Sequence, residues 1–264
     1  MIPRLHGFEF CEKSWLPQVI REGFMDCLNQ IHRLGQPYRH IAPVVSAWAA
    51  RFSAEEVLDL GSGGGGQVAT VLEHIERQGL KAPRFVLSDL YPDVSAWRAL
   101  QEHLGPERVG FFDSPVAFSA LPEQSRALTI FSAFHHLPPE AASSLLAEVV
   151  AHRDGICIVE FTRRTWLDLA SMIPAFLLNL LAPLTTPRFR LGKLLLSPVT
   201  AAMVSFDGLV SALRSYSADE ILAMLPPGTD GIFLVESGEV AWGRLPFSKS
   251  TYFLLSRRDR LKAV

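Results

Sequence analysis

Apolar residues recur along the chain with two alternating periods, and this alternation predicts a layered α/β fold. Between Trp15 and Ile31 they recur at helical spacing, and IAPVVSAWAARF predicts a second, short helix. Runs that are apolar throughout then alternate with helical segments. We expect strands at 57–60, 84–90, 108–113, 127–134 and 155–162, with helices between them, among them 94–104 and 138–153. Such strands are typical of a parallel sheet covered by helices on both faces.

The pattern changes after residue 165. Residues 165–205 are strongly apolar, and LASMIPAFLLNLLAPLTTP carries no charge. Its length borders on that of a membrane-spanning helix, but Pro174, Asn179 and Pro183 interrupt it. We therefore expect a buried lid or an element at a membrane surface in preference to a span.

The C-terminal part returns to regular elements. Ser217 and Glu220 have the spacing of a capping box at a helix start. IFLVESGEVAWG and STYFLLSRR predict two strands paired as an antiparallel hairpin. The predicted organisation is an N-terminal helical cap (1–50) and a domain (51–264) that contains a substrate-side insert (165–216).

Composition and charge narrow the functional classes. The chain is 48% hydrophobic and 20% charged, which is typical of a globular protein. A net charge of -2 provides no basic surface for nucleic acid. The three cysteines lack metal-ligand spacing, and the N-terminus lacks the apolar run of a secretory signal. We expect a reduced, cytoplasmic protein with no metal site.

The stretch VLDLGSGGGGQ (57–67) carries the clearest chemical signal. A strand that ends in a glycine-rich turn and opens a helix lets the backbone approach a ligand closely. The glycines satisfy two patterns: the dinucleotide pattern G-x-G-x-x-G at Gly61, Gly63 and Gly66, and D-x-G-x-G-x-G at Asp59, Gly61, Gly63 and Gly65. By themselves they do not choose between the two.

Two carboxylates near the loop help to discriminate. Asp59, at the end of the first strand, would repel a pyrophosphate, whereas it could meet a cationic ligand group or orient the loop. This favours a positively charged cofactor. Asp89 ends the second strand, where a carboxylate receives ribose hydroxyls in either pattern. Together they predict a nucleoside with a cationic group.

VLDLGSGGGG, SDLYP, FFD and IFSAFHHLPP, at the ends of successive strands, resemble the class I S-adenosylmethionine-dependent methyltransferases. The resemblance covers residues 50–162. It implies a seven-stranded, mostly parallel, Rossmann-like sheet of order 3-2-1-4-5-7-6 and S-adenosylmethionine as cofactor. By the resemblance, Gly61, Gly63 and Gly65 form the floor of the cofactor site and Asp89 holds the ribose. Tyr91 flanks the adenine, and Asp113 with Ser114 lies near its amine. The run of four glycines leaves open which glycine makes the closest contact.

Methyl transfer needs a base only where the acceptor must lose a proton. His135 and His136 follow the fourth strand, at the sheet edge where α/β folds bind ligands, and both are candidate bases. Glu160 ends the fifth strand at the same edge and is a third catalytic candidate. Arg163, just beyond it, is a candidate for substrate binding. Alternatively, a histidine caps the next helix, and Glu160 and Arg163 pair with each other or with solvent.

Further substrate-binding candidates lie outside the strand ends. The resemblance places the segment with Trp15 over the pocket as a lid, although a buried tryptophan at a helix start is an alternative. Arg214 could clamp a substrate carboxylate, and Tyr216 lies beside it in sequence. The apolar insert indicates a hydrophobic acceptor or a lid that excludes water. A peripheral membrane contact is disfavoured, because the segment lacks a lysine-rich polar face.

We therefore expect a methyltransferase that acts on a small, apolar or amphipathic molecule. An enzyme of this fold with other sulfonium chemistry, such as cyclisation with release of methylthioadenosine, is an alternative. An NAD(P)-dependent oxidoreductase and a non-catalytic cofactor-binding module are two more. The sequence names neither the acceptor nor the oligomeric state.

Overall fold

The computed structural model describes residues 2–13, 15–52, 56–185, 191–242 and 245–261. The chain divides into two compact units. The sheet unit comprises Tyr38–Phe161, Ser217–Val240 and Ser250–Val264, and the helical unit comprises Met1–Pro37, Thr162–Tyr216 and Ala241–Lys249. The predicted division into an N-terminal cap (1–50) and a domain (51–264) stays a prediction.

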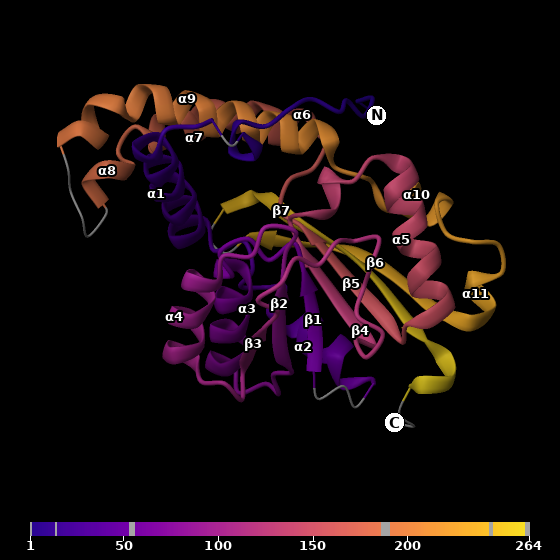
Figure 1. Ribbon diagram of the computed structural model, residues 1–264. Coiled ribbons are helices and arrows are strands. Elements are labelled where there is room, and N and C mark those ends of the chain that lie inside the picture. The colour runs from indigo at the N-terminus through magenta and orange to yellow at the C-terminus, as the bar shows by residue number, and fades with distance from the viewer. Residues whose placement is uncertain (1, 14, 53–55, 186–190, 243–244, 262–264) are drawn as a thin grey trace. The chain divides into compact units, whose positions relative to one another are not determined.

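Seven strands form one sheet in the order β3-β2-β1-β4-β5-β7-β6 (Figure 1). They are β1 (Glu56–Leu60), β2 (Arg84–Ser88), β3 (Val109–Phe111), β4 (Ala127–Phe131), β5 (Gly155–Glu160), β6 (Phe233–Trp242) and β7 (Leu245–Arg257). The first five strands pair in parallel, and β7 is antiparallel to β5. The predicted sheet order and mostly parallel pairing are confirmed.

The described helices of the sheet unit are α2 (Ala42–Ala50), α3 (Gly66–Arg77), α4 (Val94–Leu104), α5 (Pro139–His152), α10 (Ala218–Ala223) and α11 (Thr229–Ile232), with the 3-10 turns η2 (Phe134–His136) and η3 (Arg258–Arg260). Side-chain caps begin α4 and α10. The Asp93 carboxylate accepts the Ala96 amide at the start of α4. Ser217 and Glu220 form the predicted capping box of α10. These caps satisfy amide groups that a helix start leaves without partners.

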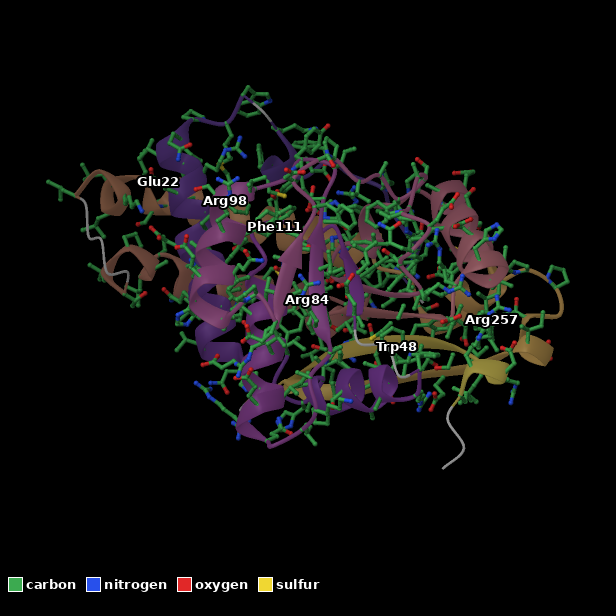
Figure 2. All side chains as sticks on the ribbon, turned by 60° about the horizontal axis from the view of Figure 1, so that its bottom comes forward. Glu22, Trp48, Arg84, Arg98, Phe111 and Arg257 are labelled. Carbon is green, nitrogen blue, oxygen red and sulfur yellow. The ribbon has the colours of Figure 1, made fainter. Side chains whose placement is uncertain are left out.

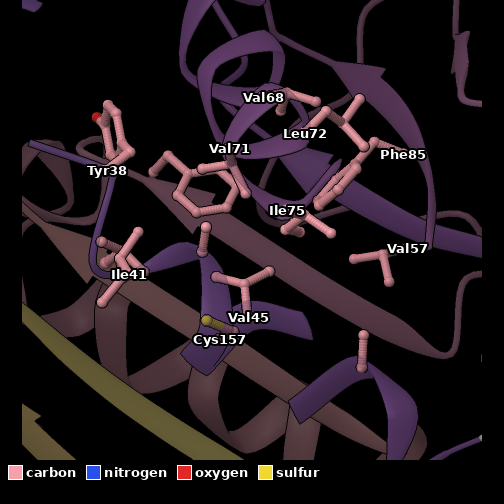
Figure 3. Close-up of a cluster of buried hydrophobic side chains, with 14 of the residues drawn as sticks. Tyr38, Ile41, Val45, Val57, Val68, Val71, Leu72, Ile75, Phe85 and Cys157 are labelled. Atoms are coloured by element: carbon pink, nitrogen blue, oxygen red, sulfur yellow. The ribbon is translucent and has the colours of Figure 1, made fainter. Parts of the chain in front are cut away.

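The core of the sheet unit lies between the strands and the helices beside them. Figure 3 shows part of it, with Val68, Leu72 and Ile75 of α3 packed near Val57 and Phe85 of the sheet. Trp48 of α2, labelled in Figure 2, is also fully buried, and its indole nitrogen donates to the Leu255 carbonyl oxygen at 3.1 Å. Each such side chain contributes roughly 1.5–3 kcal/mol by its burial. This packing fixes the strand ends.

The helical unit is built mainly from the N-terminal segment and the apolar stretch. Its elements are η1 (Phe10–Glu12), α1 (Gln18–Gly35), α6 (Trp166–Ala170), α7 (Met172–Asn179), α8 (Ala182–Thr185) and α9 (Leu191–Arg214). Helices α1, α7 and α8 pack against α9. Their small core includes Phe24, Cys27, Ala182 and Val204. Among the described residues, α9 is the one helix long and apolar enough to cross a membrane by length and composition alone.

Candidate active site

Three glycines of the 61–66 loop adopt left-handed backbone conformations. The φ angles are 69° at Gly61, 51° at Gly63 and 78° at Gly65, which is also the N-cap of α3. Residues with side chains rarely adopt such angles. Gly64 and Gly66 do not have them. The glycines that the backbone requires are therefore those of the D-x-G-x-G-x-G pattern.

The surroundings of these glycines differ. A Cβ at Gly61 would lie 3.0 Å from the Ala133 Cβ and 3.3 Å from the Phe118 Cζ, and a Cβ at Gly65 would lie 3.0 Å from side-chain carbons of Leu87 and Leu100. No atom lies within 4 Å of a Cβ built at Gly63. Gly61 and Gly65 are thus packed against the protein, and the open backbone at Gly63 can approach a ligand.

Hydrogen bonds hold the loop to the end of β2. The Ser62 amide donates to the Ser88 carbonyl at 3.0 Å, and the Ser88 amide donates to the Ser62 hydroxyl at 3.1 Å. The indole of Trp97, in α4, donates to the Gly63 carbonyl oxygen at 2.7 Å. Sequence reasoning missed Trp97, because nothing in the chain pattern relates α4 to the loop.

Asp59 is buried in β1, and its carboxylate orients the loop that follows. Its carboxylate accepts the Ser62 hydroxyl at 2.7 Å and the Thr129 hydroxyl at 2.8 Å. Burial raises the pKa of Asp59 to about 7, against the lowering effect of these two hydrogen bonds. Of the two predicted uses, orientation of the loop is the one that these bonds support. Contact with a cationic cofactor stays a prediction.

Asp89 follows β2 and faces the loop. One carboxylate oxygen accepts the Gly63 amide and the other accepts the Tyr91 amide, each at 2.9 Å. A carboxylate oxygen has two lone pairs, so both oxygens can accept a further hydrogen bond from a ligand hydroxyl. The side chain of Tyr91 is exposed beside it.

The segment after β3 also lies at Asp89. The Val116 amide donates to the Asp89 carbonyl oxygen at 2.9 Å, and the ring of Phe118 lies against Gly61. Asp113 and Ser114, both exposed, precede this contact. The structure thus brings the ends of β1, β2 and β3 together around one loop. Sequence reasoning missed Phe118, because this residue lies outside the motifs of the sequence.

His135 and Glu160 form a buried pair at the ends of β4 and β5. The His135 Nδ1 lies 2.7 Å from the Glu160 Oε2, and the His135 amide donates to the Glu160 Oε1 at 3.1 Å. Since the carboxylate accepts from Nδ1–H, the basic lone pair of the ring lies on Nε2. Glu160 therefore pairs with His135, whereas the sequence alternative paired it with Arg163 or solvent.

The neighbours of this pair fix the turn after β4. The His136 ring stacks beside that of His135 with centroids 4.3 Å apart. Ser132 has a positive φ of 54°, which is unusual for a residue with a side chain, and its hydroxyl lies 2.9 Å from the buried hydroxyl of Tyr38. Such strain is often found at functional sites. Sequence reasoning assigned a role to neither residue, although Ser132 lies within the stretch IFSAFHHLPP.

The four predicted substrate-binding residues all belong to the helical unit. Trp15 is exposed, so the alternative of a buried tryptophan is wrong. Arg163 pairs with Asp168 at 3.1 Å. Arg214 is buried and pairs with Glu9 and Glu12. Tyr216 lies under the Arg4 guanidinium. Their contact with a substrate stays a prediction.

The two neighbouring glycines Gly65 and Gly66 provide a matched test of the loop conformation. Gly65→Ala combines a positive φ with Cβ contacts at 3.0 Å, and we expect it to lower the free energy of unfolding by about 1–3 kcal/mol. Gly66→Ala enters open space in α3, and it should change stability by less than about 1 kcal/mol or raise it. Urea unfolding of both variants measures the difference. Equal losses would show that the loop does not have this conformation.

Comparisons with known proteins give likenesses of structure alone. No family model matches the sequence, and no curated protein sequence matches it. The fold is similar to that of the S-adenosylmethionine-dependent methyltransferase SibL in its apo form, with a TM-score of 0.56 and 16% identity over 92% of this chain and 60% of that chain. It is similar to an O-methyltransferase family 2 protein from Planctomyces limnophilus in complex with apigenin (TM-score 0.53, 12% identity, 93% and 63% coverage). It is also similar to magnesium protoporphyrin IX methyltransferase from Synechocystis PCC 6803 with bound S-adenosylhomocysteine (TM-score 0.50, 15% identity, 93% and 90% coverage).

The chain spans about three fifths of the first two proteins and most of the third. These likenesses, with the strand order, show that the chain has the fold of the class I S-adenosylmethionine-dependent methyltransferases. The predicted fold is confirmed.

Proposed function

We propose that this chain is an S-adenosylmethionine-dependent methyltransferase that methylates a hydroxyl group of a small, apolar or amphipathic molecule. The observation that carries the proposal is the buried His135–Glu160 pair, with Nδ1 and Oε2 2.7 Å apart. His135 follows β4 and lies two residues after Ala133. Ala133 packs against Gly61 of the glycine loop. A base beside a cofactor loop is the arrangement that proton removal from an acceptor needs.

The residues at the loop fit the cofactor. The backbone at Gly63 has no neighbouring atom where a side chain would stand, so it offers a surface for the methionine part. Asp89 retains acceptor capacity for two ribose hydroxyls. Tyr91 would flank the adenine, and Asp113 and Ser114 would lie near its amine. When bound, S-adenosylmethionine supplies a methyl group made electrophilic by its sulfonium.

His135 then acts as general base. Its Nε2 would accept the proton of the acceptor hydroxyl as the oxygen takes the methyl group, and the products would be a methyl ether and S-adenosylhomocysteine. Glu160 holds the ring with Nδ1 protonated and stabilises the imidazolium that forms, because a carboxylate beside a buried cation offsets its desolvation. Glu160 is a positioning residue, and His136 is a second candidate base.

The acceptor class rests on the apolar insert and on the partner of one structural neighbour. The neighbour from Planctomyces limnophilus is a complex with apigenin, a hydroxylated aromatic molecule. Trp15, Arg163, Arg214 and Tyr216 are proposed to contact the acceptor. No nucleic-acid partner and a cytoplasmic location stay predictions.

Turnover is tested by incubating the chain with S-adenosylmethionine and a panel of hydroxylated aromatic compounds that includes apigenin. Mass spectrometry should detect S-adenosylhomocysteine together with a product one methyl group heavier than its acceptor. Release of methylthioadenosine would indicate transfer of another part of the cofactor. Cofactor binding without any product would favour the non-catalytic module, and a control without acceptor measures background hydrolysis.

A further inference from the structure

The outer surface of helices α6–α9 has an unusual polarity for a protein in water. Among the described residues from 166 to 206, every exposed one is uncharged, and both charged ones, Asp168 and Lys193, are buried. Eight large apolar side chains among them are more than half exposed: Trp166, Leu167, Ile173, Leu177, Leu181, Leu184, Leu191 and Leu195. We call these eight the apolar surface. Soluble monomers rarely expose so many large apolar groups close together.

The helices that carry the apolar surface contact one another within the helical unit. Helices α7 and α8 pack against α9, and α6 contacts both α7 and α9. Figure 1 shows α7, α8 and α9 side by side, in orange. The surface is therefore shared by neighbouring helices and is not a set of scattered residues.

Polar groups of these helices lie on their inner side, toward α1. The Lys193 ammonium lies 2.8 Å from an Asp26 carboxylate oxygen and 3.5 Å from one of Glu22. Gln30 donates to the Leu178 carbonyl oxygen at 2.8 Å and accepts the Thr185 hydroxyl at 3.0 Å. The side of the helices that faces protein is thus partly polar, and the side that faces outward is apolar. An apolar medium around the outer side of the helices accounts for polar groups that face protein and apolar groups that face outward.

The same stretch of sequence carries a net positive charge. Residues 163–206 contain five basic residues and one acidic residue, a net charge of +4, although the whole chain carries -2. Arg163 and Arg164 directly precede Trp166, and Arg188 and Arg190 lie in sequence between α8 and α9, outside the described residues. Basic residues beside an apolar surface are attracted to anionic lipid headgroups.

From this polarity and charge we propose that the apolar surface docks onto the surface of a bilayer that contains anionic lipid. The sequence disfavoured membrane contact because the segment lacks a lysine-rich polar face. Two facts weigh against that objection: α1 covers the side of α9 where Lys193 lies, and four arginines adjoin the helices of the apolar surface in sequence. Insertion is shallow, because Lys193 and its carboxylate partners must stay on the protein side. An exposed tryptophan at one end is typical of side chains at a membrane interface.

A lipid surface fits better than a second copy of the chain. Specific protein interfaces carry roughly one hydrogen bond per 100–200 Å² and a polar rim that fixes orientation. The described exposed residues from 166 to 206 include no charged side chain that could provide such bonds. Lipid requires no directional contact, and the net positive charge would repel a second copy of the same surface.

Vesicle co-sedimentation tests the proposal. The chain should sediment with vesicles of phosphatidylcholine and phosphatidylglycerol, more weakly with phosphatidylcholine alone, and less as salt rises. The triple variant Leu177→Gln, Leu181→Gln, Leu195→Gln should lose at least about tenfold in vesicle affinity. A matched control, Leu80→Gln, Leu222→Gln, Ile232→Gln, removes three exposed apolar residues of the sheet unit and should bind as the unchanged chain does.

A second measurement does not depend on the folding of the triple variant. Vesicles of brominated phosphatidylcholine and phosphatidylglycerol should quench the tryptophan fluorescence of the chain, and Trp166→Phe should reduce that quenching. Absence of sedimentation, equal binding of the two triple variants, or quenching unchanged by Trp166→Phe would overturn the proposal. A dimer in analytical ultracentrifugation that the Leu177, Leu181, Leu195 variant dissociates, without vesicle binding, would identify a second copy as the occupant.

Discussion

Replacing His135 by alanine should lower the rate constant of methyl transfer by roughly 10³-fold, while the Kd of S-adenosylhomocysteine stays within about threefold of the original. The reason is that the acceptor hydroxyl loses its proton to the Nε2 of His135, whereas cofactor contacts lie at the glycine loop and Asp89. The rate is measured with an acceptor identified from the panel, under saturating cofactor. Calorimetry provides the Kd.

Two further variants locate the effect. Glu160→Gln keeps the shape of the partner but removes the charge that stabilises the imidazolium, so kcat should fall by roughly 10²-fold with KM nearly unchanged. Glu160→Asp should restore part of that loss. His136→Ala should have a smaller effect than His135→Ala, because Glu160 contacts His135. A larger loss for His136→Ala would transfer the role of base to His136.

Replacing Asp89 by alanine should weaken S-adenosylhomocysteine binding by roughly 100-fold. The carboxylate is proposed to accept both ribose hydroxyls, and it also accepts the amides of Gly63 and Tyr91. Losing two hydrogen bonds to a charged group costs on the order of 3 kcal/mol. Titration calorimetry measures the change.

Asp113→Ala is the matched control for Asp89. Asp113 is an exposed carboxylate at the end of the neighbouring strand, and it is expected to contact only the adenine amine. Its replacement should therefore weaken binding by less than about tenfold. Binding that is equal in the Asp89 variant and the unchanged chain would contradict the proposed cofactor site.

The regular part of the fold could be predicted from sequence because its signals are local. Strands such as 155–160 are apolar throughout, and the capping box at Ser217 and Glu220 lies within four residues. The glycine loop was ambiguous, since Gly65 and Gly66 are chemically identical. The backbone angle, positive at Gly65, distinguishes the two glycines.

Side-chain pairings between residues far apart in sequence were beyond sequence reasoning. His135 and Glu160 are 25 residues apart, and which of two adjacent histidines meets the carboxylate depends on the turn after β4. Ser132 sets that turn with its positive φ, yet the sequence around it contains no glycine or other signal of such a conformation.

The apolar insert was difficult for another reason. Its composition was evident, but whether Leu195 faces protein or surroundings depends on which side α1 covers. The structure also buries the one described lysine of this stretch, Lys193, against Asp26. The order of polar and apolar residues in the sequence does not determine which face of a helix is covered by another helix.

The central claim is that the glycine loop binds S-adenosylmethionine and not a dinucleotide. Titration calorimetry of the unchanged chain with S-adenosylhomocysteine, and in parallel with NADH, tests it most directly. The account predicts saturable one-to-one binding of S-adenosylhomocysteine and no heat of binding with NADH. Binding of NADH without binding of S-adenosylhomocysteine would contradict it.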